Sequence, residues 1–248
     1  MKHLILPLAI VVAIGATGAA AYLLHLAWML HRHNVERSLD PIGPPPAAPA
    51  PGGAPHPRVL LFGDSRISMW NPPPTLPGGS IVVRGRPGET TALSRLRLQR
   101  DLDVIEPDIV VLEIGVNDLK QVGLFPGRAA EIAAGVETNL RAMLDILSGG
   151  GRQVVLLTIF PVGERGLLHR LIWPGNIDGA VRATNARLRA WGGDRLTVLD
   201  CDPILAPQGS IDPRYAVDPL HLNEAGYTAL DAAIDPILAR LVGGGATP

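Results

Sequence analysis

Five short apolar stretches recur along the chain after residue 57, with amphipathic stretches between them. They are 58–63 (RVLLFG), 80–85 (SIVVRG), 108–115 (DIVVLEIG), 153–160 (QVVLLTIF) and 196–200 (LTVLD). Most show little alternation of polar and apolar residues. Continuous runs of Val, Ile and Leu are typical of strands that are covered on both faces, as in parallel sheets. We therefore predict a central, mainly parallel, five-stranded sheet.

The segments between these stretches have the length and period of helices. The predicted helices cover 90–105, 128–148, 177–191 and 223–242. In the first, we expect Leu93, Leu96 and Ile105 to face the core while the arginines face solvent. Asn223 is a suitable N-cap for the last helix, whose apolar face consists of Leu230, Ile234, Ile237, Leu238 and Leu241. Alternating strands and helices predict a three-layer α/β/α sandwich.

A long apolar run, residues 4–30, precedes this pattern. It exceeds the roughly 20 residues that a membrane-spanning helix needs. Tyr22 and Trp28 lie toward its C-terminal end, where aromatic rings suit a membrane interface. A cleaved signal peptide is the alternative, because residues 19–21 are small, but the apolar run continues well beyond them. We predict that 1–35 is an N-terminal transmembrane anchor, with a signal peptide as the alternative.

Residues 36–57 form a linker rich in proline and alanine. Proline fixes φ and removes a hydrogen-bond donor, so the segment reads as an extended spacer. Residues 58–248 are then enough for one domain with a sizeable core. The few basic residues beside the apolar run slightly favour a cytoplasmic domain. The spacer and the signal-like start favour an exported one, so we expect a membrane-anchored protein with a periplasmic or other extracytoplasmic domain.

Composition and charge exclude several classes of function. The 248 residues carry a net charge of −1 and only 4% aromatic residues, which argues against a nucleic-acid surface. Cys201 is the only cysteine, so the chain has no intramolecular disulfide and no CxxC site. It is best explained as a small buried apolar residue. Nothing in the sequence sets the oligomeric state.

Polar residues follow the ends of the predicted strands. Ser65 comes after the first strand, Gly88 after the second and Asn117 after the third, while Asp218 and His221 precede the last helix. Each alone has an ordinary explanation as a turn or cap residue. Ligands of α/β folds lie outside the carboxyl ends of the strands, so we expect these residues to meet there. Together they offer a nucleophile, an acid–base pair and donors for an oxyanion.

The motifs that carry these residues resemble those of the SGNH hydrolases, the GDSL-type esterase and lipase superfamily. The resemblance covers 58–242 in family order, and its four motifs are Gly63-Asp64-Ser65, Gly88 within RGRPGETT, Gly115-x-Asn117-Asp118 and Asp218-x-x-His221. It implies the flavodoxin-like fold of that superfamily and a reaction that needs no metal or cofactor. Two positions depart from the usual pattern: Arg66 replaces a small residue, and Val83 stands where many members have asparagine.

The resemblance also implies a role for each residue. Ser65 is the nucleophile, His221 is the general base, and Asp218 orients the ring. The oxyanion donors are the backbone N–H groups of Ser65 and Gly88 and the side-chain amide of Asn117. Arg66 beside the nucleophile puts the family's usual substrates in doubt.

The predicted function is a serine esterase that hydrolyses carboxylic esters, with short-chain acyl, lipid or O-acetyl esters as substrates. An acyltransferase using the same acyl-enzyme is one alternative, and a non-catalytic, envelope-anchored binding domain is another. Residues 161–177 follow the fourth strand, and their apolar members either line an acyl pocket, form a lid or pack on the core. These members are Leu167, Leu168, Leu171, Ile172 and Trp173. The acyl and alcohol specificity stays open.

Overall fold

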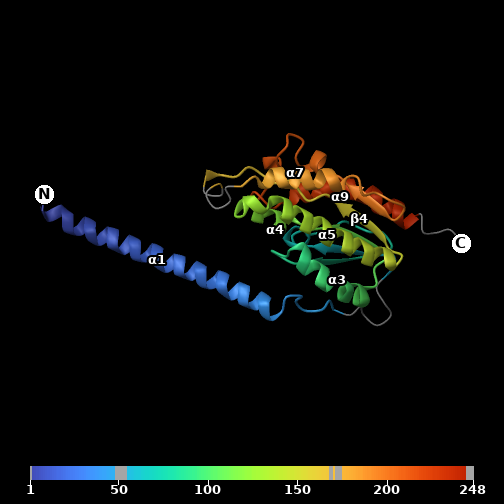
Figure 1. The fold of residues 1–248 in the computed structure, drawn as a ribbon, viewed down its shortest axis with the longest axis horizontal. Helices are drawn as coiled ribbons and strands as arrows, with labels where there is room; N and C mark the ends of the chain where they lie inside the picture. Colours follow the sequence, from blue (N-terminus) through green and yellow to red (C-terminus); the bar gives the residue numbers. More distant parts are fainter. Residues whose placement is uncertain (1, 48–54, 168–169, 171–174, 244–248) are drawn as a thin grey trace. The chain divides into compact units, whose positions relative to one another are not determined.

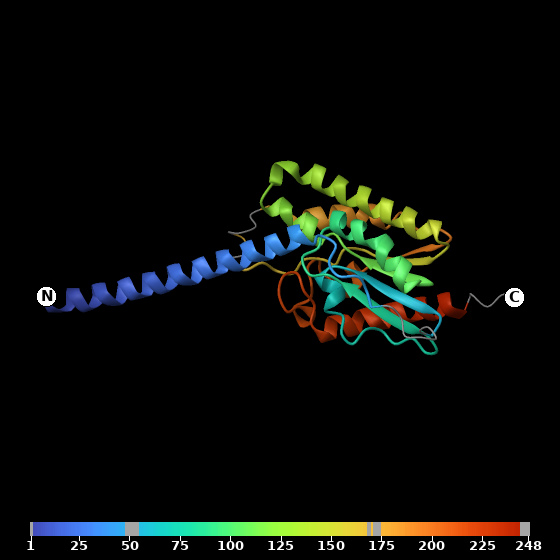
Figure 2. The ribbon, with the colours of Figure 1, turned by 90° about the horizontal axis from the view of Figure 1, so that it is seen from below.

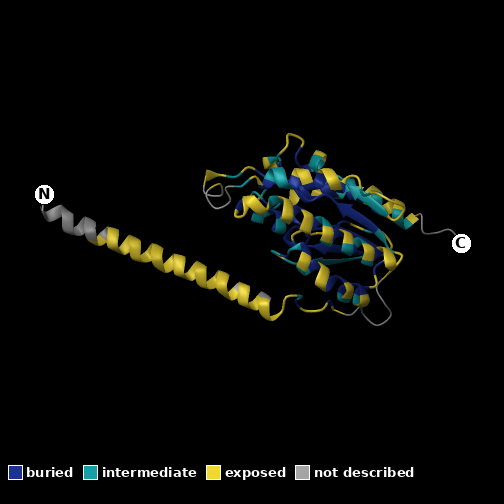
Figure 3. Ribbon diagram, viewed as in Figure 1, coloured by how far each residue is buried: buried dark blue, intermediate teal, exposed yellow. Residues whose placement is uncertain are grey.

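The computed structural model describes residues 2–47, 55–167, 170 and 175–243. The chain divides into two compact units, Met1–Pro44 and Pro45–Pro248. The first contains the helix α1 (Lys2–Leu39), which continues past the predicted end of the anchor at residue 35. Within it, Val12–Glu36 is long and apolar enough to cross a membrane, although a signal sequence meets the same criteria of length and composition. The exposed residues of α1 are yellow in Figure 3.

The second unit is built on a parallel five-stranded sheet with the order β2-β1-β3-β4-β5 (Figure 1). Its strands are β1 (Arg58–Gly63), β2 (Ser80–Gly85), β3 (Ile109–Glu113), β4 (Gln153–Leu157) and β5 (Leu196–Leu199). Each lies within one of the five predicted apolar stretches. The register sets Leu61 beside Val83 on one side and Val111 on the other. The prediction of a parallel five-stranded sheet is therefore confirmed.

Helices cover both faces of the sheet and form the three predicted layers. One face carries α3 (Thr91–Ile105), α5 (Ala129–Gly149) and α7 (Ile177–Leu188), and the other carries α2 (Ser65–Ser68), α8 (Asp202–Leu205) and α9 (Glu224–Gly243). In Figure 2 the red helix α9 and the yellow-green helix α5 lie on opposite sides of the strands. Short helical turns complete the loops at α4 (Val116–Leu119), η1 (Lys120–Gly123), η2 (Pro126–Arg128) and η3 (Pro213–Tyr215).

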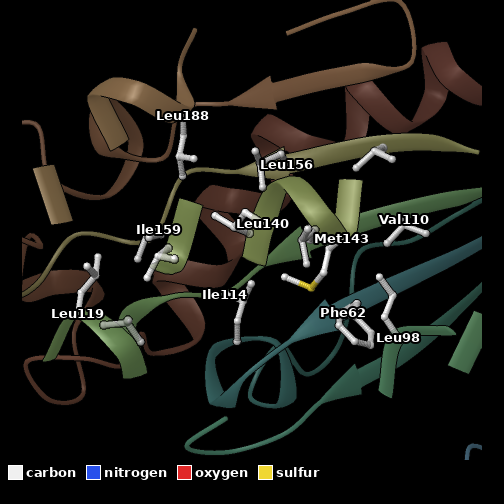
Figure 4. Close-up of a cluster of buried hydrophobic side chains, with 14 of the residues drawn as sticks. Phe62, Leu98, Val110, Ile114, Leu119, Leu140, Met143, Leu156, Ile159 and Leu188 are labelled. Carbon is white, nitrogen blue, oxygen red and sulfur yellow. The ribbon is translucent and has the colours of Figure 1, made fainter. Parts of the chain in front are cut away.

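The core consists of two apolar clusters, one on each face of the sheet. Successive side chains of a strand point to opposite faces, so Leu60 and Phe62 join the cluster under α3 and α5 (Figure 4). Val59 and Leu61 join the cluster under α9, which also contains the buried Cys201. Burying one such aliphatic side chain contributes about 1.5–3 kcal/mol to folding. The clusters thus fix the strands that carry the site.

One predicted helix faces differently from our expectation. In α3, Leu96 is 59% exposed, whereas Arg97 is 1% exposed. The expectation that Leu96 faces the core is therefore wrong, and so is the expectation that all arginines of this helix face solvent, because Arg97 is buried. Its guanidinium lies over the Phe62 ring at 3.9 Å and is surrounded by acceptors. A buried cation is tolerated when it is paired and hydrogen-bonded in this way.

The sheet order places the site. From β1 the chain first moves outward to β2 and then crosses to β3 on the other side. In such open sheets the point where the order reverses leaves a crevice at the carboxyl ends of the strands. Here that point lies between β1 and β3, which lead into Ser65 and Asn117.

Candidate active site

The turn after β1 is shaped by close contacts. A Cβ at Gly63 would lie 1.9 Å from the carbonyl oxygen of Glu113, so the strand can end here only with glycine. The Asp64 side chain then accepts a hydrogen bond from the Arg66 backbone N–H at 2.9 Å and caps α2. Ser65 opens this short helix with 8% of its surface exposed. Its hydroxyl therefore stands at the carboxyl end of β1.

His221 lies directly against this hydroxyl. Ser65 Oγ is 2.9 Å from His221 Nε2, and His221 Nδ1 is 2.8 Å from Asp218 Oδ2. A carboxylate can only accept, so Nδ1 carries the ring proton and Nε2 is left to accept from the serine hydroxyl. The structure thus brings Ser65 against the neighbouring Asp218 and His221, which lie far from it along the chain, in the arrangement that the sequence predicts.

The loop before α9 holds the acid and the ring in one turn. Asp218 Oδ1 accepts from the backbone N–H groups of Leu220 at 2.7 Å and His221 at 3.0 Å. Burial of Asp218 by itself raises the pKa of this carboxyl. The His221 ring N–H and the Leu220 backbone N–H outweigh burial and hold the pKa below its usual range. Asp218 is therefore ionised at neutral pH. Asn223 caps α9 through the Gly226 N–H at 3.1 Å, as predicted.

Asn117 lies buried between the turns after β1 and β2. Its Nδ2 donates to Asp64 Oδ2 at 3.1 Å and to the Glu89 carbonyl at 3.0 Å. Its Oδ1 accepts from Lys120 Nζ at 2.6 Å. The ammonium can only donate and the carboxylate only accept, so the orientation of the amide is set. Both amide hydrogens are engaged in this state, and an oxyanion would have to share or replace one of these two bonds.

Gly88 lies in the loop after β2 with φ +70°, a conformation that favours glycine. One buried guanidinium ties this loop to β1. Arg97 Nε donates to Glu89 Oε2 at 2.8 Å, and Arg97 Nη2 donates to the Gly63 carbonyl at 3.0 Å. Arg97 Nη1 donates to Asp101 Oδ2 at 2.7 Å. Arg97 therefore holds Gly63, at the end of β1, and Glu89, in the loop of Gly88, in fixed positions relative to each other.

Sequence reasoning missed Arg97. The pairing with Asp101 one helical turn later was a readable signal. The contacts with Glu89 and the Gly63 carbonyl depend on how the helix packs on the sheet. The spacing of residues along the sequence does not reveal this packing.

Arg66 does not face the substrate side. Its side chain is 0% exposed and lies in the interior, where Nη1 is 3.4 Å from Glu113 Oε1. This separation is long for a hydrogen bond, and among the described residues Glu113 Oε2 has no hydrogen-bond partner. Burial, followed by repulsion from Asp64, raises the pKa of Glu113 to about 8. The Glu113 carboxyl is therefore protonated at neutral pH.

The buried Glu113 makes stability depend on pH. Its pKa rises from 4.5 to about 8 on folding, so between these values the folded state holds more protons than the unfolded state. The free energy of unfolding then falls as pH rises from about 5 to 8, by up to about 1 kcal/mol per pH unit. We expect Glu113→Gln to remove this contribution in urea denaturation at several pH values. Glu131→Gln, at an exposed glutamate, is the control. Equal slopes for all three proteins would contradict the assignment.

Part of the predicted acyl-binding segment lies outside the described residues, namely Leu168, Leu171, Ile172 and Trp173. Leu167 is described and is 76% exposed. It therefore does not pack on the core. Across the described residues, no group of three or more His, Cys, Asp or Glu side chains is placed to hold a metal ion.

Comparisons with known proteins identify a family for the chain. Residues 66–229 match the model of the GDSL-like lipase/acylhydrolase family. The platelet-activating factor acetylhydrolase IB subunit alpha1 of Rattus norvegicus is 30% identical over 197 residues, which cover 75% of this chain and 77% of that protein.

Solved structures share the fold. A GDSL-like lipase from Bacteroides thetaiotaomicron superposes with a TM-score of 0.62 at 21% identity, covering 85% of this chain and 97% of that one. An acetylxylan esterase from Geobacillus stearothermophilus superposes with a TM-score of 0.51 at 18% identity, covering 75% and 95%.

Proposed function

The chain belongs to the GDSL-like lipase/acylhydrolase family within the SGNH hydrolases and is thus an ester hydrolase, and we propose that it works through an acyl-enzyme formed on Ser65. The observation that carries the proposal is the chain of hydrogen bonds from Ser65 Oγ to His221 at 2.9 Å and from His221 to Asp218 at 2.8 Å. A hydroxyl is a weak nucleophile until an adjacent base removes its proton. In this site His221 is that base, and its hydrogen bond to Asp218 orients the ring.

In the first half-reaction, Ser65 Oγ attacks the carbonyl carbon of the ester while His221 Nε2 takes the hydroxyl proton. The electron pair of the carbonyl double bond moves to its oxygen. The imidazolium is stabilised by the ionised Asp218. When the carbon–oxygen bond to the alcohol breaks, His221 returns the proton to the departing alkoxide, which leaves as an alcohol. Ser65 keeps the acyl group.

The developing oxyanion needs donors in fixed positions. The backbone N–H groups of Ser65 and Gly88 and the amide of Asn117 serve this role in the proposal. Arg97 holds the first two segments together, and Asp64 and Lys120 orient the third. Preorganised donors stabilise the charge with little rearrangement, and Asn117 shares or exchanges one of its two amide bonds to serve the oxyanion. In the second half-reaction His221 activates a water molecule, which releases the acid and restores Ser65.

Acetyl and other short-chain esters are the proposed substrates. The names of two similar proteins, an acetylhydrolase and an acetylxylan esterase, point to small acyl groups in those proteins. Lipid esters and O-acetylated glycans are both compatible sources of such a group.

We further propose that α1 anchors the protein in a membrane with the catalytic domain on the extracytoplasmic side. The apolar stretch Val12–Glu36 and the proline-rich linker at 36–57 support this arrangement.

A panel of p-nitrophenyl esters, from acetate to palmitate, tests the proposed function on the full chain in detergent. We expect kcat/KM to be highest for acetate and to fall with acyl length. Release of free acid in the presence of an added alcohol identifies a hydrolase, whereas formation of a new ester identifies an acyltransferase. Absence of turnover for every ester would contradict the proposal and leave the binding-domain alternative.

A further inference from the structure

We propose that Arg66 is a positioning residue that holds the loop carrying His221 in place against the helix carrying Ser65. The inference rests on the proposed function, since it assigns the serine and the histidine to one reaction. The sequence alone left open whether Arg66 affects the choice of substrate. Its side chain is buried and turned away from the substrate side, so its role is structural.

The contacts of the guanidinium define the role. Arg66 Nε donates to the carbonyl of Leu220, the residue just before His221, at 2.9 Å. Arg66 Nη1 donates to the carbonyl of Phe160 at 2.9 Å, and Nη2 donates to that of Pro161 at 3.5 Å. One side chain therefore links the nucleophile helix both to the histidine loop and to the segment after β4.

The backbone of Arg66 is fixed as firmly as its side chain. Its N–H donates to Asp64 Oδ1 at 2.9 Å, and its carbonyl accepts from the Tyr227 hydroxyl at 2.7 Å. Arg66 directly follows Ser65 in the chain, so any shift of the guanidinium relative to this backbone is transmitted to the Ser65–His221 distance. The side chain acts as a short, rigid link between the neighbours of the two reacting groups.

The shortest hydrogen bonds of the Arg66 side chain do not go to a carboxylate. Glu113 Oε1 accepts from Nη1 at the longer distance of 3.4 Å, and burial raises the pKa of that carboxyl. The shorter bonds go to backbone carbonyls, which are buried and costly to leave without a donor. The bonds of Asp218 to Leu220 and His221 lie within the loop itself. Loss of Arg66 should therefore leave the Asp–His pair formed and loosen the Ser–His pair.

Time courses of fluorophosphonate labelling of the full chain separate positioning from folding. For Arg66→Met we expect nearly the whole population to become labelled, with a rate constant lower by about 10- to 100-fold, because small misplacements of reacting groups carry penalties of this size. The kcat for an acetyl ester should fall in parallel while KM changes little. Arg66→Lys should give an intermediate rate constant, because an ammonium cannot reach all three carbonyls with the geometry of the guanidinium.

Arg58→Met is the matched control. Arg58 is also a buried arginine, lies at the other end of β1 and donates to the Ile105 carbonyl. We expect this variant to lose stability without a change in the rate constant of labelling.

Three outcomes are decisive. A wild-type rate constant with a smaller labelled fraction in Arg66→Met would assign Arg66 to folding alone and overturn the inference. If Arg66→Met fails to fold, a wild-type rate constant in Arg66→Lys overturns it equally. Labelling that persists in Ser65→Ala would instead overturn the proposed function, so the two failures are distinguishable.

Discussion

Ser65→Ala is expected to lower kcat for ester hydrolysis by about 10⁴-fold or more, since removing the nucleophile of a serine hydrolase removes the covalent route itself. Among the described residues the hydroxyl bonds to His221 at 2.9 Å, and the residue sits in a tight turn where a smaller side chain fits. The fold and the free energy of unfolding should therefore change little. Initial rates with p-nitrophenyl acetate, together with thermal denaturation, measure both effects.

Ser68→Ala is the matched control for this substitution. Ser68 lies in the same short helix, and its hydroxyl donates to the Ser65 carbonyl at 3.0 Å without contacting His221. Its loss should leave kcat within a few-fold of the wild-type value. Undiminished turnover by Ser65→Ala would reject Ser65 as the nucleophile, and an equal loss in both variants would point to damage of the helix.

Asn117→Ala is expected to lower kcat by about 10²- to 10³-fold while KM changes little, because an oxyanion donor acts mainly in the transition state. The substitution also removes one donor to Asp64 and one to the Glu89 carbonyl. The amide therefore both bonds to its neighbours and stabilises the oxyanion. A fall in kcat at an unchanged KM reports the second of these roles. Steady-state kinetics over a range of acetyl ester concentrations provide both constants.

Asn139→Ala controls for the loss of a partly buried amide nearby. Asn139 lies on α5 and donates to the Thr91 hydroxyl at 3.0 Å, outside the candidate site. We expect it to alter stability slightly and kcat very little. If Asn117→Ala raised KM and left kcat unchanged, its amide would bind the ground state and the oxyanion role would be excluded.

The fold could be predicted from the sequence because most strands are nearly continuous apolar runs. A strand covered on both faces has no polar side, so Val59, Leu61 and Val111 leave a signal that needs no knowledge of their partners. The helices between the strands then set the parallel topology. The division of the chain into an anchor, a linker and a hydrolase domain stays a prediction.

The site residues were readable because parallel strands bring their carboxyl ends to one edge. Ser65 and Asn117 each follow such an end, and a turn of three residues joins Asp218 to His221. The supporting arginines were not readable in the same way. Arg66 and Arg97 bind mostly backbone carbonyls and residues distant in sequence. Every residue has a backbone carbonyl, so the sequence does not show which one an arginine will bind. Polarity alone therefore assigned Arg97 to the surface.

The buried side chains of Arg66 and Arg97 indicate how this site keeps its shape. Arg97 joins the end of β1 to the loop of Gly88, and Arg66 joins the start of α2 to the loop of His221. Each forms several bonds in a fixed planar geometry that a lysine cannot reproduce. The catalytic groups thus rest on polar links between loops as well as on the apolar core.

The site of covalent modification by a fluorophosphonate, identified by mass spectrometry of peptides from the full chain, tests the proposed mechanism most directly. We expect one adduct, located on Ser65, whose formation is strongly slowed in His221→Ala because the 2.9 Å bond to the base is lost. An adduct on any other residue, or labelling of Ser65 at the same rate with and without His221, would contradict it.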